Sequence, residues 1–396
     1  MCTSIIVRPL FAAGTLAAVL AGCASTNPTI GPATQYPQSN PASQRVLPTL
    51  PTQGPILVQP LPVAPGAGRT TLAPTGPHLV QYFSIPGTTP FYITLGPGQA
   101  FWFTTGDTPG SIGRIKPSKP YTLFPLPPSV WNVSLRIVTG PDGNLWATVD
   151  AYPGRGGIAK ITPSGHVTVY PIPTYGADLG YIAVGSDGNL WFTEHSPNKF
   201  GRITPSGTIT EFPFEDIGAP NGIVSGPDGR LWICEQGALD ASTGHQTYGR
   251  IERVNTDGTI YATYDIAPNN WQNVPEDITV GADGKLWFTQ FNAISQTIYE
   301  ISNVTVNGAI TQYDTPNTNA GPGSPVLAGD GNVWFSEAYA AQLARVKPSG
   351  HIKEFPLPQD GAPLPTAPYG LTTNGGKRLQ IWFADYQNSR IGRFSI

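Results

Sequence analysis

The segment GSDGNLWFTE at residues 185–194 decides the fold, because its order of turn, tryptophan and polar residue returns along most of the chain. Asp187-Gly188 favours a tight turn, and Trp191 lies in the apolar segment that follows it. The sequence then continues through FGRI at residues 200–203, a further strand pattern, and through the turn PSG at residues 205–207. This unit therefore predicts short strands, four in all, joined by tight turns.

Tryptophan marks the same position in successive units at spacings of 41 to 55 residues. The tryptophans concerned are Trp102, Trp146, Trp191, Trp232, Trp287, Trp334 and Trp382. A period of about 40–50 residues with several strands per unit is typical of a β-propeller blade. The sequence therefore predicts an all-β, seven-bladed propeller over residues 78–396, in which the tryptophans pack between blades.

The last unit suggests how the ring closes. After Trp382 the chain offers one more strand pattern, around residues 391–395, so this unit lacks its outer strand. The missing pattern, LVQYFSI, stands at residues 79–85. Pairing of these two segments would cover an edge that otherwise invites aggregation. The propeller is therefore predicted to be closed by an N-terminal strand.

Composition excludes some functions. Charged residues make up 12% of the 396 residues, about half of the ~25% that is usual, and the formal net charge is −3. Nucleic-acid binding requires clustered Lys and Arg to neutralise phosphates, and the chain has no such run. Nucleic acid is therefore not an expected partner.

The first 77 residues predict export and anchoring. Residues 1–22 have the layout of a secretory signal, and LAGC at residues 20–23 resembles the cleavage box of bacterial lipoproteins. This resemblance implies lipidation of Cys23; the alternative is an ordinary signal with a chance cysteine. Residues 23–77 are rich in Pro and predict a disordered linker. The protein is thus expected to be an exported lipoprotein of the bacterial cell envelope, attached to the membrane by its lipid.

One side of the ring gathers the most polar candidates. The first strand of each blade begins where the tryptophan strand ends, and we call this side the mouth side. The carboxylates found there three residues after a tryptophan are Glu194, Glu235, Glu337 and Asp385. Carboxylate oxygens suit Mg²⁺ or Ca²⁺, so these residues are candidate metal ligands. The alternative is that each one bonds to backbone N–H groups of a neighbouring loop.

Aromatic and histidine side chains belong to the same side. Tyr92, Tyr181 and Tyr369 are predicted to form part of a ligand-binding rim. His195, beside Glu194, and His245 are candidate general bases, because a histidine near carboxylates can accept a proton at neutral pH. The alternative for both is a solvated loop histidine.

The repeat resembles that of the streptogramin lyases, also called virginiamycin B lyases. The resemblance rests on the segments GSDGNLWFTE (185–194), NKFGRIT (198–204), KEFPLP (353–358) and PYGL (368–371). It implies a seven-bladed propeller that opens a cyclic depsipeptide antibiotic by Mg-dependent elimination at an ester C–O bond. That chemistry needs a base to remove an activated α-proton and a metal to stabilise the developing enolate.

The resemblance also implies where the catalytic residues would lie. The catalytic histidine would stand at Tyr369 and a metal-binding glutamate at Ala367. A second glutamate would stand at Tyr386, beside Asp385, and a further histidine at Ser324. The family's catalytic residues are therefore substituted in this chain.

Three hypotheses follow. The leading one is a lipid-anchored propeller that binds a small molecule or protein at its acidic and aromatic rim. The second is a metal-dependent C–O lyase or hydrolase whose base has moved to His195 or His245. The third is an interaction disc with no small-molecule site.

Overall fold

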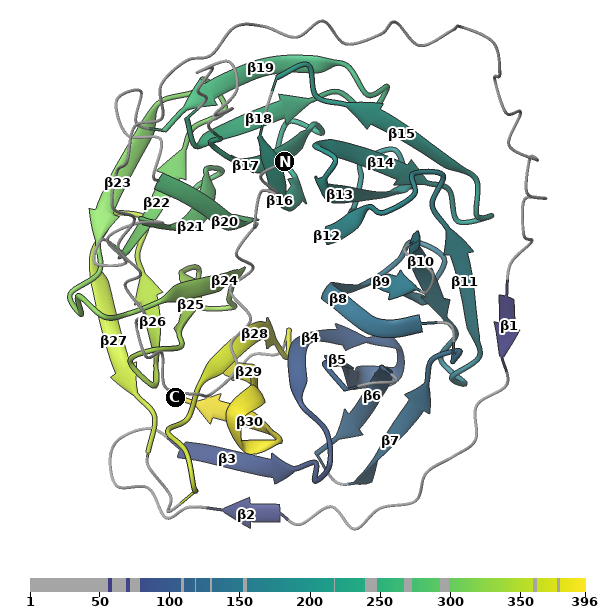
Figure 1. Cartoon of the computed structure of the whole chain (residues 1–396). Helices are drawn as coiled ribbons and strands as arrows, with labels where there is room; N and C mark the ends of the chain where they lie inside the picture. Colours follow the sequence, from purple (N-terminus) through teal and green to yellow (C-terminus); the bar gives the residue numbers. More distant parts are fainter. Residues whose placement is uncertain are drawn as a thin grey trace, which may run out of the picture. The chain divides into compact units, whose positions relative to one another are not determined.

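The computed structural model describes residues 56–58, 69–71, 79–107, 110–117, 119–128, 130–151, 155–216, 218–238, 248–266, 273–292, 299–358, 362–375 and 378–396. Seven antiparallel sheets stand in a ring, with β4, β8, β12, β16, β20, β24 and β28 nearest the centre (Figure 1). Each sheet is one blade, and its strands run outward in chain order, except that β3 and β2 lie outside β30 in the last blade and β1 lies outside β11 in another. The predicted all-β, seven-bladed propeller is thus confirmed.

The blades are numbered from the first complete sheet along the chain. Blade 1 is β4 (Pro90–Gly96), β5 (Ala100–Thr105), β6 (Ser111–Lys116) and β7 (Lys119–Pro125). Blade 2 is β8 (Val130–Thr139), β9 (Leu145–Ala151), β10 (Arg155–Ile161) and β11 (Val167–Pro171). Blade 3 is β12 (Asp178–Val184), β13 (Leu190–Ser196), β14 (Lys199–Ile203) and β15 (Ile209–Pro213). Blade 4 is β16 (Ala219–Ser225), β17 (Leu231–Gln236), β18 (Arg250–Val254) and β19 (Ile260–Asp265).

The remaining blades complete the ring. Blade 5 is β20 (Asn273–Val280), β21 (Leu286–Asn292), β22 (Tyr299–Val304) and β23 (Ile310–Asp314). Blade 6 is β24 (Pro322–Leu327), β25 (Val333–Glu337), β26 (Gln342–Val346) and β27 (Ile352–Pro356). Blade 7 is β28 (Pro368–Thr373), β29 (Gln380–Asp385), β30 (Arg390–Ser395) and β3 (Leu79–Ser84). Two short 3-10 turns, η1 (Pro97–Gln99) and η2 (Tyr386–Asn388), interrupt the strand pattern.

The ring closes as predicted, through the pairing of β3 with β30. The two strands run antiparallel, and Val80 lies opposite Phe394. Two three-residue strands, β1 (Ile56–Val58) and β2 (Arg69–Thr71), add to the outer edges of blades 2 and 7. Both lie in the segment predicted to be a linker, so parts of that segment pair with the propeller.

Tryptophans hold the blades together. All seven are buried, and Trp146 of blade 2, for example, belongs to one buried apolar cluster with Leu179 and Phe192 of blade 3. In the Asp-Gly turns the glycine takes a positive φ, as at Gly188 with φ 75°, which a glycine adopts without steric cost. The aspartate of the same turn accepts a hydrogen bond from the indole, at 3.1 Å for Trp191 and Asp187. The repeated turn therefore fixes the orientation of the indole that packs between neighbouring blades.

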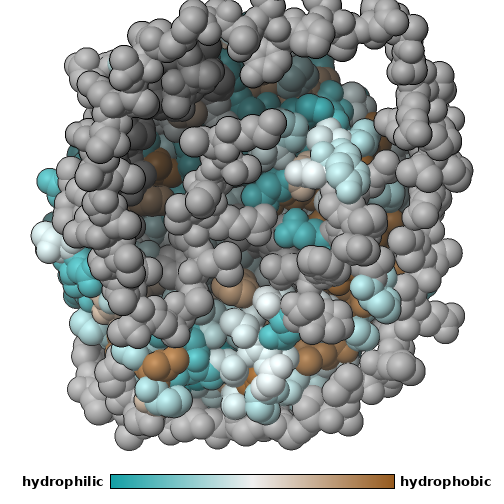
Figure 2. Space-filling view, viewed as in Figure 1, coloured by the Kyte–Doolittle hydropathy of each residue, from teal (hydrophilic) through white to brown (hydrophobic). Residues whose placement is uncertain are grey.

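The described surface carries no large apolar area on the face shown in Figure 2, where hydrophilic and hydrophobic residues are interspersed. The exposed large hydrophobic residues are scattered along the chain, and Tyr175 is the most exposed of them. Among the described residues, no helix has the length and hydrophobicity that crossing a membrane requires.

Candidate functional site

The inner strands break their pairing register near the mouth side of every blade. In blade 3 the break lies between Leu179 and Ile182, and in blade 7 between Pro368 and Leu371. Equivalent breaks occur in the other blades. A β-bulge re-aims the side chains it carries, which explains why the residues at these breaks leave the regular sheet pattern.

Side chains from the bulges meet at the axis of the ring. Tyr92 of blade 1 contacts Tyr181 of blade 3 through their hydroxyl groups at 2.9 Å, although blade 2 stands between these blades. Arg136 of blade 2 forms an ion pair with Asp277 of blade 5. Contacts between blades that are not neighbours require the side chains to reach the centre. We call Tyr92, Arg136, Tyr181, Glu276, Asp277 and Tyr369 the axial cluster.

Aromatic rings extend this cluster toward blade 7. The ring centroids of Tyr92 and Tyr369 are 5.2 Å apart, and those of Phe91 and Tyr369 are 6.0 Å apart. Phe91 also stacks on Tyr386 at 5.8 Å. Edge-to-face and stacked pairs at these distances stabilise one another. The predicted rim residues Tyr92, Tyr181 and Tyr369 are thus brought together, although Tyr92 and Tyr181 are almost completely buried.

The axial cluster holds a carboxyl group that changes charge near neutral pH. Burial, together with the neighbouring Asp277 carboxylate, raises the pKa of Glu276 to about 7, and a hydrogen bond with Tyr369 opposes the rise. Burial also raises the pKa of the Tyr369 phenol well above its usual value of 10.0. Tyr369 therefore stays neutral and can donate a hydrogen bond, while Glu276 can accept or release a proton.

His195 lies on the mouth side of blade 3. It belongs to the mouth-side end of the tryptophan strand β13 and is half-buried. Its Nδ1 lies 3.2 Å from Oδ1 of Asn221, a residue in the bulge of β16. His245, the other predicted base, lies outside the described residues.

The four predicted metal ligands are not brought together. Glu194, Glu235, Glu337 and Asp385 are completely buried, and each lies on the tryptophan strand of a different blade. The reason is strand alternation: side chains of the tryptophan strand point toward neighbouring blades, and only the inner strands face the axis. Within the part of the chain that the structure describes, no three or more His, Cys, Asp or Glu residues come together so that they could hold a metal ion.

Three of these carboxylates have side-chain partners at the start of the third strand. Asp385 accepts a hydrogen bond from Nε of Arg390 at 2.6 Å, and Glu235 accepts one from Arg250 at 2.9 Å. Glu337 is bound by the amide of Gln342. The predicted backbone bonding is seen at Asp385, whose Oδ1 accepts from the N–H of Ala367 at 3.1 Å.

Glu194 differs from the other three. Both of its carboxylate oxygens are buried without a hydrogen-bond partner among the described residues. The lysine that pairs with it in the sheet, Lys199, turns its ammonium to Thr174 at 2.7 Å and Glu211 at 3.2 Å instead. Burial and the Glu211 carboxylate raise the pKa of Glu194 to about 7. This carboxyl group is therefore largely neutral in mildly acidic solution.

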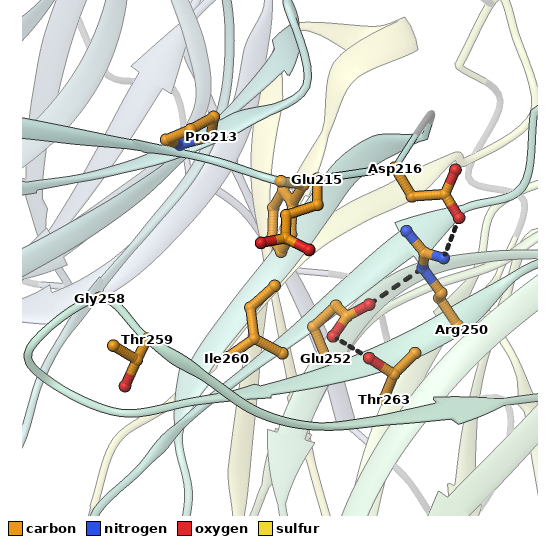
Figure 3. A pocket seen from close by; sticks show the side chains of 10 residues that line it. Pro213, Glu215, Asp216, Arg250, Glu252, Gly258, Thr259, Ile260 and Thr263 are labelled. Carbon is orange, nitrogen blue, oxygen red and sulfur yellow. Dashed lines mark hydrogen bonds and ion pairs between the residues drawn. The ribbon is translucent and has the colours of Figure 1, made fainter.

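A separate pocket of about 650 Å³ lies away from the axis, where the end of β15 meets the outer strands of blade 4 (Figure 3). Arg250 lines it and contacts Asp216 at 3.3 Å and Glu252 at 3.0 Å. Burial, with the nearby Glu235, raises the pKa of Glu252 to about 7. These charged groups are already paired with one another.

Comparison of the sequence with known protein families assigns the chain to one of them. The sequence matches the Virginiamycin B lyase family over residues 68–248 and 219–396. The chain belongs to the virginiamycin B lyase family.

Individual members of the family are similar to this chain. A virginiamycin B lyase from Nocardia farcinica (strain IFM 10152) is 30% identical over 228 residues, which are 57% of this chain and 70% of that protein. A solved streptogramin B lyase is 28% identical with a TM-score of 0.66, covering 80% of this chain and 97% of the other. A catalytically inactive variant of virginiamycin B lyase from Staphylococcus aureus, solved with quinupristin, is 26% identical with a TM-score of 0.69, covering 81% and 99%.

The resemblance implies four catalytic positions, and of the residues that stand there Tyr369 belongs to the axial cluster. Tyr386 stacks on Phe91, Ser324 lies in the break of the inner strand β24, and Ala367 donates its N–H to Asp385. Sequence reasoning missed Arg136 and Asn221. Both residues stand one or two positions before the apolar residue at which regular pairing of the inner strand resumes, Ile137 in blade 2 and Ile223 in blade 4. This position could have been read from the sequence, because the bulge turns its side chain toward the axis.

Proposed function

We propose that this propeller binds a depsipeptide-like ligand over the axial cluster on its mouth side. The observation that carries the proposal is the set of bulges, which turn polar and aromatic side chains of separate blades toward one point. Packing between blades does not require polar and aromatic side chains to converge at the axis in this way. Ligand sites typically combine aromatic surface with a few convergent polar groups.

The chemistry of the cluster suits a peptide ligand with aromatic groups. Phe91 and Tyr369 keep part of their rings exposed and can stack on a ligand ring. Glu276 and Tyr369 can accept and donate hydrogen bonds to ligand amides. The relative from Staphylococcus aureus was solved with quinupristin, which supports a ligand of the same kind here.

Quinupristin is the probe that tests this proposal. Isothermal titration calorimetry should show binding to the full chain, and Tyr369→Ala should weaken it by about 10–100-fold, because roughly 1.5–3 kcal/mol of aromatic burial is lost. The control is Tyr261→Ala, since Tyr261 lies on the outer strand β19 and stacks on Arg230. No measurable binding, or equal weakening by both variants, would contradict the proposal.

We further propose that the protein is lipid-anchored in the bacterial envelope through Cys23. This proposal is supported by the LAGC segment at residues 20–23. Metabolic labelling of the expressing cells with a fatty acid should mark the wild-type protein in the membrane fraction. Cys23→Ala should lose the label and leave that fraction, whereas Cys234→Ala should keep both, because Cys234 is buried in the propeller. Label on the Cys23→Ala protein would contradict the anchor.

A further inference from the structure

The axial cluster contains two carboxyl groups and one guanidinium. Glu276 and Asp277 are adjacent in the bulge of β20, and Arg136 of blade 2 forms an ion pair with Asp277. Asp277 is completely buried: its Oδ1 accepts a hydrogen bond from Arg136, while its Oδ2 has no hydrogen-bond partner among the described residues. A buried carboxylate oxygen without a partner is unfavourable, because it has lost its contact with water. A further positive charge near this bulge would therefore be stabilised.

Glu276 is the carboxyl group of the cluster that a ligand can reach. Its side chain is half-buried, and it shares a hydrogen bond with Tyr369 of blade 7. Burial and the neighbouring Asp277 carboxylate raise the pKa of Glu276 to about 7. This rise means that a second negative charge beside Asp277 is unfavourable. A cation bound next to Glu276 would relieve the repulsion between the two carboxylates.

Aromatic rings border the same carboxyl group. The ring of Tyr369 is inclined by 76° to that of Tyr92 and by 80° to that of Phe91, with centroids 5.2 and 6.0 Å away. Phe91 and Tyr369 stay partly exposed. The face of an aromatic ring carries partial negative charge and attracts cations, and several rings set at steep angles are typical of sites that bind quaternary ammonium groups. The rings and the carboxylate therefore favour the same kind of ligand group.

We infer that the axial cluster selects a ligand with a protonated or quaternary amine, whose charge lies beside Glu276 and whose carbon atoms pack on Phe91 and Tyr369. The inference rests on the proposed function, because it assigns the charge of the ligand bound at the same site. An organic cation suits this surface better than a metal ion does. A metal ion needs several oxygen ligands, and the described residues bring no three His, Cys, Asp or Glu side chains together for one.

Choline and 3,3-dimethylbutan-1-ol form the matched pair of probes for this site. The two molecules have the same shape, but only choline is charged, and its charge does not change with pH. Ligand-observed NMR titration at pH 8, where Glu276 is largely ionised, should show that choline binds at least about 10-fold more tightly than the alcohol. Equal affinity of the two probes, or no binding of choline, would overturn the inference.

Variants then locate the charge that choline recognises. Glu276→Gln keeps the size of the side chain and should weaken choline binding by about 10-fold, while the affinity for the alcohol stays the same. Tyr369→Leu should weaken choline binding by about 5–30-fold through loss of the aromatic face. Glu215→Gln is the matched control and should have no effect, because Glu215 is exposed and lines the separate pocket away from the axis. Equal effects of Glu276→Gln and Glu215→Gln would overturn the inference. If Glu276→Gln does not fold, the comparison of the two probes on the wild-type protein decides.

Calorimetry with quinupristin separates this inference from the proposed function. A protein that binds quinupristin but does not bind choline would overturn the cation site alone. A protein that binds choline through Glu276 but does not bind quinupristin would support the cation site and contradict the depsipeptide-like ligand.

Discussion

The contacts in the middle of each blade repeat around the ring, whereas those at its mouth-side edge differ from blade to blade. In the middle, a basic side chain lies over the blade's tryptophan and donates to a turn carbonyl of the next blade. Arg114, for example, lies 5.4 Å from the centroid of Trp102 and donates to Pro163 at 2.8 Å. Lys160 repeats this with Trp146 and Pro205. Neighbouring blades are therefore joined by the same contacts along much of the ring.

At the mouth-side edge the corresponding positions differ from blade to blade. The residue three places after the tryptophan is paired with arginine in blades 4 and 7, through Glu235 and Asp385. In blade 3 it is Glu194, which has no hydrogen-bond partner among the described residues. Repetition in the middle holds the ring together, and variation at the edge leaves room for specific chemistry. Each prediction below tests one side of this comparison.

The largest effect is expected in the middle of a blade. Trp191→Ala should lower the free energy of unfolding by about 5 kcal/mol, because a completely buried indole and its hydrogen bond to Asp187 are lost. Urea denaturation measures this change. Tyr175→Ala, at the most exposed hydrophobic residue described, should stay within about 0.5 kcal/mol. Similar losses in both variants would show that the tryptophan layer does not dominate stability.

The next largest effect is expected at the paired edge of blade 7. Arg390→Met should cost about 3 kcal/mol, because it leaves Asp385 buried without its charged partner. Lys285→Met is the matched surface control and should cost less than about 1 kcal/mol, since its contact with Asp283 at 3.6 Å is solvent-exposed in part. Equal costs for the two variants in urea denaturation would contradict the importance of the buried pair.

The unpaired edge of blade 3 should respond to pH instead. The pKa of Glu194 is raised from 4.5 to about 7 by folding, so its contribution to stability is complete below about pH 4.5 and is lost as the pH rises through 7. Glu194→Gln should therefore match wild type at pH 4 and exceed its unfolding free energy by about 1–2 kcal/mol at pH 8. The same difference between the two proteins at both pH values would contradict this assignment.

The smallest effect is expected in the axial cluster. Tyr92→Phe removes the 2.9 Å hydroxyl contact with Tyr181 and should cost about 1 kcal/mol, because the aromatic packing stays in place. Thermal unfolding measures this loss. A destabilisation as large as that of Trp191→Ala would mean that the axial cluster contributes to stability as much as the tryptophan layer does, which would contradict its role as a ligand site.

The fold was predictable because it depends on features that repeat. The tryptophan period, the Asp-Gly turns and the strand pattern at residues 79–85 each occupy a fixed place in a blade, and the structure confirms all three. Each of these sequence features is weak alone, but their recurrence at the same place in successive repeats makes the prediction of the fold firm.

The candidate site was predictable only in part, because it depends on contacts between separate blades. Tyr92, Tyr181 and Tyr369 stand near the start of inner strands, which predicts that they lie on one side, and the structure brings them together. Glu194 and Asp385 were expected to share a rim, but both are completely buried on the tryptophan strands of separate blades. The pairing of Arg136 with Asp277 spans the ring, and no local pattern in the sequence reports such a contact.

Closure by β3 has a consequence for the order of folding. Blade 7 takes its outer strand from residues 79–84 and its other strands from residues 368–395. A chain that is synthesised from its N-terminus must therefore leave β3 without its partner until residues 390–395 have been made. During that interval β3 has no β30 to pair with, so the closing blade forms after the other six and the ring cannot be completed one blade at a time in chain order.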